Sequence, residues 1–158
     1  MNEQFPEPEI VESPERKIVA LAGDFDMETR GEIPKLWAEL WGREFEVENQ
    51  VSLTPFGVSF GHGQGTNFRY GAGYEADPPA NLPDGATVIT LRAGTYAVFS
   101  RRAPISTLPA LFDHIFQTWI PASDYALDEG AIFERYPADS GAEGDARLYE
   151  IWAPVKPR

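Results

Sequence analysis

The chain has 158 residues, of which 42% are hydrophobic and 13% aromatic, no cysteine, and a formal net charge of −12. Length and apolar content suit one globular domain or two half-size units with a shared core, and the acidity disfavours nucleic-acid binding, because phosphate backbones are met by clustered Lys and Arg. Disulfides are excluded. Without a signal peptide or a run of about 20 apolar residues, we expect a cytoplasmic protein outside the membrane.

The first elements are an extended arm at residues 1–8 and a strand at residues 17–22. A helix is predicted to begin at Ile33, with Pro34 in its first turn, where the missing N–H is not needed. Its apolar residues have the spacing of one helical face: Ile33, Leu36, Trp37, Leu40 and Trp41.

A hairpin and a linker follow. Residues 56–60 and 67–75 predict two paired strands around the glycine-rich segment 61–65. The proline-rich residues 77–85 predict a linker without regular structure, near the midpoint of the chain.

The second half begins with strands at residues 87–91 and 95–99. Ser106 or Thr107 is predicted to cap a second helix, which Pro121 ends. The apolar face of that helix contains Leu108, Leu111, Phe112, Ile115, Phe116 and Trp119. Residues 131–136 and 147–152 predict two further strands.

The two halves repeat each other. Residues 33–41 match residues 108–116 at an offset of 75, which also pairs Tyr74-Glu75 with Tyr149-Glu150 and Ser59 with Glu134. We therefore predict an α+β fold in which tandem duplicated βαββ modules form an antiparallel sheet, with two helices on one face and a central ligand groove. The single domain at 9–158 then comprises module one (about 9–76), the linker 77–85 and module two (about 86–157).

Glu134 is the first candidate for a functional residue. Strand alternation places it on one face with Ile132 and Tyr136, while Phe133 points the other way. A carboxylate among apolar and aromatic groups can pair with a buried hydrophobic cation, to which ring faces add cation–π attraction. The alternatives are a solvated glutamate on an exposed face and a glutamate paired with an arginine.

Glu75 is a second acidic candidate. It shares a strand face with Arg69 and two glycines, where another group could approach the backbone closely. We favour an ion pair with Arg69 at this position. Glu150, the repeat equivalent of Glu75, has a weaker claim to a functional role.

The aromatic residues divide between core packing and groove lining. Those on the inward helix faces are expected in the core, although a groove between the helices would expose some of them: Trp37, Trp41, Phe112, Phe116 and Trp119. Those on strands could close the floor or ends of the groove: Tyr70, Phe99, Tyr136, Tyr149 and Trp152.

Other chemistry has little support. His62 and His114 lack the spacing of a metal site, and His114 is expected on the outer helix face. The segment 61–65 has neither a following Lys-Ser/Thr nor a strand-to-helix context, which excludes a phosphate loop, and no nucleophile elbow is present. We assign no catalytic residue and expect neither a metal nor a cofactor.

Six segments follow one another in a characteristic order between about Glu9 and Pro157: residues 68–75, 82–85, 91–99, 119–125, 133–137 and 151–155. Together they resemble the effector-binding domain of AraC-type and multidrug-sensing bacterial transcription activators, also called the GyrI-like small-molecule-binding domain. The resemblance implies two βαββ modules about a pseudo-two-fold axis, and an aromatic groove between the helices with a central acid for cationic, lipophilic compounds. Glu134 matches that acid within a Phe-Glu-x-Tyr motif, whereas Glu75 matches a less uniformly acidic position.

The resemblance implies that the protein binds small cationic lipophilic or aromatic compounds. Without room for a helix-turn-helix, the chain looks like a stand-alone version of the domain, which sequesters its ligand, acts with a separate transcription regulator, or binds a protein such as gyrase. The alternatives are a hydrolase that uses Glu134 as general acid or base and an acidic protein-interaction module. The candidate ligand-binding residues are Glu134, Trp37, Trp41, Tyr70, Glu75, Phe99, Phe116, Trp119, Tyr136, Tyr149 and Trp152.

Overall fold

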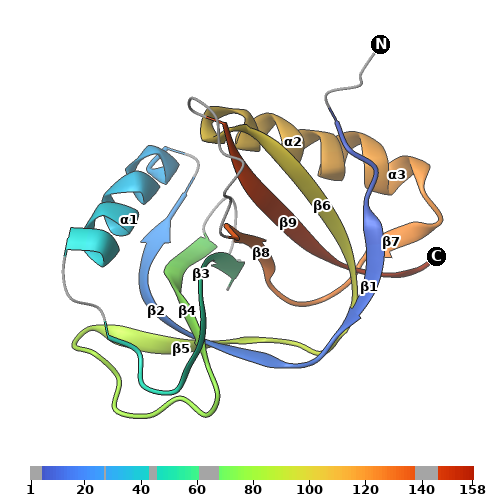
Figure 1. The fold of residues 1–158 in the computed structure, drawn as a ribbon. Coiled ribbons are helices and arrows are strands. Elements are labelled where there is room, and N and C mark those ends of the chain that lie inside the picture. Colours follow the sequence, from blue (N-terminus) through green and yellow to red (C-terminus); the bar gives the residue numbers. More distant parts are fainter. Residues whose placement is uncertain (1–4, 27, 43–45, 61–67, 138–145) are drawn as a thin grey trace.

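The computed structural model describes residues 5–26, 28–42, 46–60, 68–137 and 146–158. In these residues one antiparallel sheet has the strand order β1-β6-β9-β8-β3-β4-β2-β5, and β7 adds to it by pairing with β9 (Figure 1). The strands are β1 (Glu9–Ser13), β2 (Arg16–Phe25), β3 (Gln50–Phe60), β4 (Phe68–Ala76), β5 (Ala86–Leu91), β6 (Gly94–Pro104), β7 (Tyr125–Leu127), β8 (Ile132–Arg135) and β9 (Ala146–Pro157).

Two βαββ modules make up most of this sheet, as the repeat predicts. Module one places its strands in the order β3-β4-β2, and module two places its strands in the order β6-β9-β8. The second strand of module one is β3, and the second strand of module two is β8. These two strands pair with each other and form the seam between the modules. The predicted antiparallel α+β arrangement is confirmed.

The modules also exchange strands at their outer edges. β1 precedes β2 in the chain but pairs with β6, and β5 precedes β6 but pairs with β2. Strands that are adjacent in sequence therefore lie near opposite ends of the sheet, which curls until its edges approach each other (Figure 1). The sequence does not predict β1 as a strand, nor this exchange.

Both helices cover the same face of the sheet. One row of paired residues crosses the six central strands on that face: Leu21, Ala72, Gly57, Glu134, Ile151 and Phe99. Leu21 and Ala72 pack in the cluster beneath α1 (Ile33–Gly42), which follows the short 3-10 turn η1 (Arg30–Glu32). Ile151 and Phe99 pack in the cluster beneath α2 (Leu108–His114). The middle of the row lies between the helices.

The helices differ from the prediction in detail. Trp41 was placed on the inward face of α1 but is 64% exposed. The second helix continues from α2 through a π-helical turn, η3 (Ile115–Trp119), into α3 (Ile120–Ala122), so Pro121 does not end it. A π turn widens the backbone and replaces the i→i−4 bonds that a proline ring disrupts. None of the described helices is long and apolar enough to cross a membrane.

The predicted cap of the second helix is also wrong. Thr107, in the turn η2 (Ile105–Thr107), makes no side-chain cap hydrogen bond. Its hydroxyl donates to the Pro104 carbonyl at 2.5 Å and lies 2.8 Å from the Tyr149 hydroxyl. His114 is half-buried rather than on an outer face, because Phe5 stacks on its ring at 4.3 Å between centroids.

The opposite, concave face of the sheet is closed by a second core. Its largest rings are Phe56, Tyr96, Phe133 and Trp152, packed with aliphatic residues of β2, β5 and β6. The hairpin of β3 and β4 is confirmed, and residues 77–85 form neither helix nor strand. The predicted hairpin loop at 61–65 lies outside the described residues, as does His62.

Candidate functional site

Glu134 lies at the seam between the modules. Its strand β8 has only four residues; Gly57 of β3 is opposite Glu134 on one side and Ile151 of β9 on the other. Because the two helices cover the row to either side, the carboxylate faces the space between them. Ile132 and Tyr136 pack on this same face, and Phe133 on the other, as strand alternation predicts.

The Glu134 side chain is buried, with 5% of its surface exposed. Its Oε1 accepts one hydrogen bond from the Tyr70 hydroxyl and another from the Tyr136 hydroxyl at 3.1 Å. Within the described part of the chain, no Lys or Arg forms an ion pair with Glu134 and no hydrogen bond reaches Oε2. Burial raises the pKa of Glu134 from 4.5 to about 7, and the two hydroxyl donors offset this only in part.

Trp37 connects α1 to this carboxylate. Its indole Nε1 donates to the Tyr70 hydroxyl at 3.1 Å, and that hydroxyl donates in turn to Glu134. The Trp37 ring also stands edge-on to the Tyr136 ring, with 5.5 Å between centroids. Burial, followed by the neighbouring Glu134 carboxyl, raises the pKa of Tyr70 and of Tyr136 far above the usual range, so both hydroxyls stay protonated and donate.

A cleft of about 760 Å³ opens beside this network. Its wall is formed by residues of α1, of the turn before α2, and of the chain on either side of residues 138–145: Pro34, Trp37, Trp41, Ile105, Tyr136, Pro137, Arg147 and Leu148. Glu134 does not line the cleft. It lies behind Tyr136, which both lines the cleft and donates its hydroxyl to Oε1.

Gly57 makes room for the network. A Cβ atom at this position would lie 2.1 Å from the Tyr70 hydroxyl oxygen and 2.7 Å from Glu134 Oε1, distances that real side chains do not tolerate. The Tyr70–Glu134 hydrogen bond therefore occupies the space above a glycine. A glycine inside a strand often marks such a close approach.

The structure brings five of the candidate residues together. Glu134, Tyr70, Tyr136 and Trp37 form the hydrogen-bonded network, and Trp41 extends it along the cleft wall, 5.2 Å from Trp37 between ring centroids.

Four candidate aromatics instead pack in the core beneath the second helix. Phe99 and Tyr149 are fully buried there, and Trp119 stands edge-on to Phe99 at 5.3 Å. Phe116 packs against the same cluster and stacks on Phe112. None of the four lines the cleft described above.

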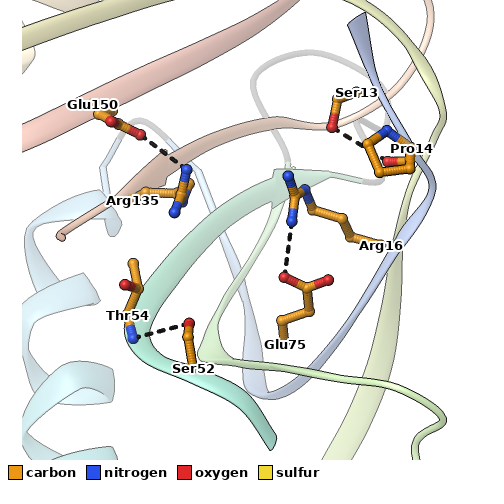
Figure 2. Close-up of polar contacts among 8 residues, drawn as sticks. All are labelled: Ser13, Pro14, Arg16, Ser52, Thr54, Glu75, Arg135 and Glu150. Atoms are coloured by element: carbon orange, nitrogen blue, oxygen red, sulfur yellow. Dashed lines mark hydrogen bonds and ion pairs between the residues drawn. The ribbon is translucent and has the colours of Figure 1, made fainter.

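Glu75 and Trp152 lie on the concave face, away from the cleft. Glu75 pairs with Arg16 at 2.9 Å, as Figure 2 shows, so the expected ion pair with Arg69 is wrong. Arg69 instead pairs with Asp24 at 3.2 Å. Trp152 packs in the concave core, and its indole donates to Glu150.

Several residues of the site were not predicted from sequence: Gly57, Pro34, Ile105, Pro137, Arg147 and Leu148. Gly57 carried a usable signal, because it interrupts a β-rich segment in the strand that the repeat aligns with the Glu134 strand. The cleft residues carried none, since they come from three separate segments that meet only when the modules dock.

Comparison with known proteins agrees with this architecture. A solved structure of SAV2435 bound to tetraphenylphosphonium is similar, with a TM-score of 0.77 at 16% identity, over 95% of this chain and 94% of that one. A structure of an EcmrR–DNA complex has a TM-score of 0.67 at 13% identity, over 98% of this chain and 59% of EcmrR. A DNA gyrase inhibitor from Serratia proteamaculans (strain 568) is 31% identical over 74 residues, which are 46% of this chain and about half (47%) of that protein.

The fold consists of two pseudo-symmetric halves, and the cleft is lined by residues of both. The model of the GyrI-like small molecule binding domain matches residues 6–156, nearly the whole chain. The chain belongs to this family, in agreement with the resemblance seen in the sequence.

The space above Gly57 gives a first prediction. Gly57→Ala places a methyl group where the Tyr70 hydroxyl and Glu134 Oε1 now meet, so it should break that hydrogen bond and lower the free energy of unfolding by about 1–3 kcal/mol. Urea denaturation measures the loss. Gly31→Ala is the control, because its Cβ would meet nothing within 4 Å; equal stability of the two variants would contradict the close approach.

The buried acid gives a second prediction. Because the pKa of Glu134 is about 7 in the folded chain and 4.5 is its ordinary value, the folded state binds the extra proton between these values. The contribution of protonated Glu134 to the free energy of unfolding is therefore fully present below pH 4.5 and is lost as the pH rises through 7. Glu134→Gln removes the ionisation and should be more stable than the original protein by about 3 kcal/mol at pH 8.

Urea denaturation of both proteins from pH 4.5 to pH 8.5 checks this difference. The two stability curves should meet at the acidic end and diverge with rising pH. Parallel curves would show that Glu134 ionises no less readily in the folded state than in the unfolded state.

Proposed function

We propose that the chain binds lipophilic organic cations with aromatic groups in the cleft beside α1, and that the Glu134 carboxylate is their counter-charge. One observation carries the proposal. Glu134 is a buried acid without an ion-pair partner in the described residues, and it accepts a hydrogen bond from Tyr136, whose side chain lines an aromatic cleft. A buried carboxylate in that condition gains more from a bound cation than from any neutral ligand.

The cleft supplies the other interactions that such a ligand needs. Trp37, Trp41 and Tyr136 offer ring faces, each worth about 0.5–2 kcal/mol against a cation. Pro34, Ile105 and the remaining apolar wall accept hydrophobic substituents, and about 760 Å³ is within the range of drug-sized sites. The tetraphenylphosphonium complex of SAV2435, which shares the fold, supports this ligand class.

Glu134 does not line the cleft, so close contact with its carboxylate requires a side chain to move aside, and we assign this movement to Tyr136, which both lines the cleft and donates to Oε1. The movement breaks one hydrogen bond to Oε1, while the Tyr70 hydrogen bond can remain. The positively charged ligand then takes the place of the neutral Tyr136 hydroxyl beside the Glu134 carboxylate. Binding therefore favours the ionised form of Glu134 and lowers its pKa.

A second candidate function is hydrolysis of a reactive small molecule. A glutamate with a pKa of about 7 is suited to transfer protons near neutral pH, and Tyr136 could donate to a developing negative charge. Turnover of an electrophile in the cleft, abolished by Glu134→Gln, would favour catalysis over binding alone.

We further propose that a protein partner binds to a surface outside the cleft. We also propose a cytoplasmic location, which the cysteine-free sequence supports. The net charge of −12 and the similarity to a DNA gyrase inhibitor support a basic partner. Salt-sensitive capture of such a partner that does not change in Glu134→Gln would separate this role from the cleft.

The proposal predicts that tetraphenylphosphonium binds and that Glu134→Gln raises its Kd by about 30-fold or more, since removing one partner of a buried charge pair costs at least about 2 kcal/mol. Affinity of the unaltered protein should also fall about tenfold per pH unit below pH 7, because the cation must displace a proton from Glu134. Isothermal titration calorimetry at several pH values measures both effects.

Two controls accompany this experiment. Glu75→Gln removes a carboxylate from the opposite face and should leave the Kd within about twofold. Triphenylphosphine oxide, which is neutral, should bind weakly and without the pH dependence. Equal affinities of the original protein and Glu134→Gln for tetraphenylphosphonium would refute the counter-charge role.

A further inference from the structure

We propose that Arg135, on the face of the sheet opposite the cleft, is the positioning residue that holds Glu134 and Tyr136 in their binding geometry. This inference rests on the proposed function, because it concerns the same carboxylate. Arg135 stands between the two site residues in the chain, and strand alternation turns it to the concave face while they lie on the helix-covered face.

The strand that carries Glu134 is short and lies between β3 and β9, so side chains on both neighbouring strands can fix its exact position. β8 contains four residues and ends one residue after Glu134. Beyond it, the Tyr136 amide donates to the Pro55 carbonyl at 3.2 Å. On the cleft side, the residue opposite Glu134 is Gly57, which has no side chain to support it.

Arg135 adds side-chain contacts to this backbone pairing on both neighbouring strands. Its pairing partners in the sheet are Phe56 of β3 and Glu150 of β9. Its guanidinium lies 5.4 Å from the Phe56 ring centroid and 5.5 Å from that of Trp152, and Nη1 is 3.3 Å from Glu150 Oε1 (Figure 2). The Trp152 indole donates to the same Glu150 oxygen at 2.9 Å.

These contacts lie one row away from the binding network. The row Phe56–Arg135–Glu150 is held by charge and by ring faces, and the next row, Gly57–Glu134–Ile151, carries the acid. A shift of β8 along or out of the sheet would have to break the Arg135 contacts. Such a shift would also move Oε1 away from the Tyr70 and Tyr136 hydroxyls, whose hydrogen bonds depend on sub-ångström placement.

The charge of Arg135 is directed away from the cleft. Because Glu150 pairs with the guanidinium, Arg135 can anchor the strand without neutralising Glu134, which has no ion-pair partner among the described residues. The sheet thus separates Arg135, which supports the strand, from Glu134, which is the proposed counter-charge of the ligand.

The chain offers a matched control in the Arg16–Glu75 pair. Glu75 is the repeat equivalent of Glu150, and both ion pairs are drawn in Figure 2. The strand register places both on the concave face, because Glu75 pairs with Ile18 and Arg135 with Phe56 of the concave core. The side chains of Arg16 and Glu75 are 22% and 14% exposed, close to the 25% and 19% of Arg135 and Glu150. Arg16 also lies 5.9 Å from the Trp152 ring centroid, but it does not adjoin the acid in the chain.

The test compares Arg135→Met and Glu150→Gln with Arg16→Met by two measurements. The first is the Kd of tetraphenylphosphonium, which should rise about tenfold in the first two variants and stay within about twofold in the control. The second is the pKa of the Glu134 carboxyl in the ligand-free protein, followed by ¹³C NMR. It should rise in both anchor variants, because the hydroxyl bonds that lower it are weakened.

Glu150→Gln separates positioning from simple charge effects. Removing a nearby negative charge lowers the pKa of Glu134 by electrostatics alone, whereas loss of the anchor raises it. This variant also carries the test if Arg135→Met does not fold, and partial recovery of the Kd in Arg135→Lys would support the anchor.

The inference is overturned if the anchor variants match Arg16→Met in both measurements, or if Glu150→Gln lowers the pKa of Glu134. If the unaltered protein does not bind tetraphenylphosphonium, the proposed function fails, and the carboxyl titration of the ligand-free variants still decides the positioning role.

Discussion

The structure depends on one constraint, which is that a carboxylate must be buried at the seam of two modules without a positive side chain to neutralise it. Glu134 accepts two hydroxyl donors at one oxygen, and no ion-pair partner reaches it from the described residues. Its raised pKa is the consequence, since burial disfavours the charged form. Burying the ionised carboxyl lowers the free energy of unfolding of the ligand-free chain, and the proposed cation offsets this cost when it binds. The feature that favours cation binding therefore destabilises the ligand-free fold.

The duplication provides the scaffold, and its departures from symmetry provide the site. The offset of 75 aligns Glu134 with Ser59, so the acid exists in one module only. In the sheet Glu134 faces Gly57, whose missing side chain leaves space for the Tyr70 hydroxyl contributed by module one. The two modules thus contribute different parts: module two brings the carboxylate and the Tyr136 donor, and module one brings the Tyr70 donor and the open space.

Local patterns in the sequence predicted much of the fold and less of the site. The 3.6-residue spacing identified α1, the repeat located the second helix and the modules, and alternation placed Glu134 with Tyr136. The exchange of β1 and β5 escaped prediction because strand pairing is a long-range property. Aromatics of the cleft and of the core were not separated: helical periodicity cannot tell a core face from a cleft wall for Trp41, and strand alternation cannot do so for Phe99. Arg135 escaped attention because its contacts appear only when β3, β8 and β9 are aligned.

The most direct test of the central claim is the titration of the Glu134 carboxyl itself, followed by ¹³C NMR with and without saturating tetraphenylphosphonium. The account predicts a pKa of about 7 in the free protein, and a decrease of at least one unit in the complex as the cation stabilises the ionised form. A carboxyl that titrates near 4.5 in the free protein, or at an unchanged pKa in the complex, would contradict it.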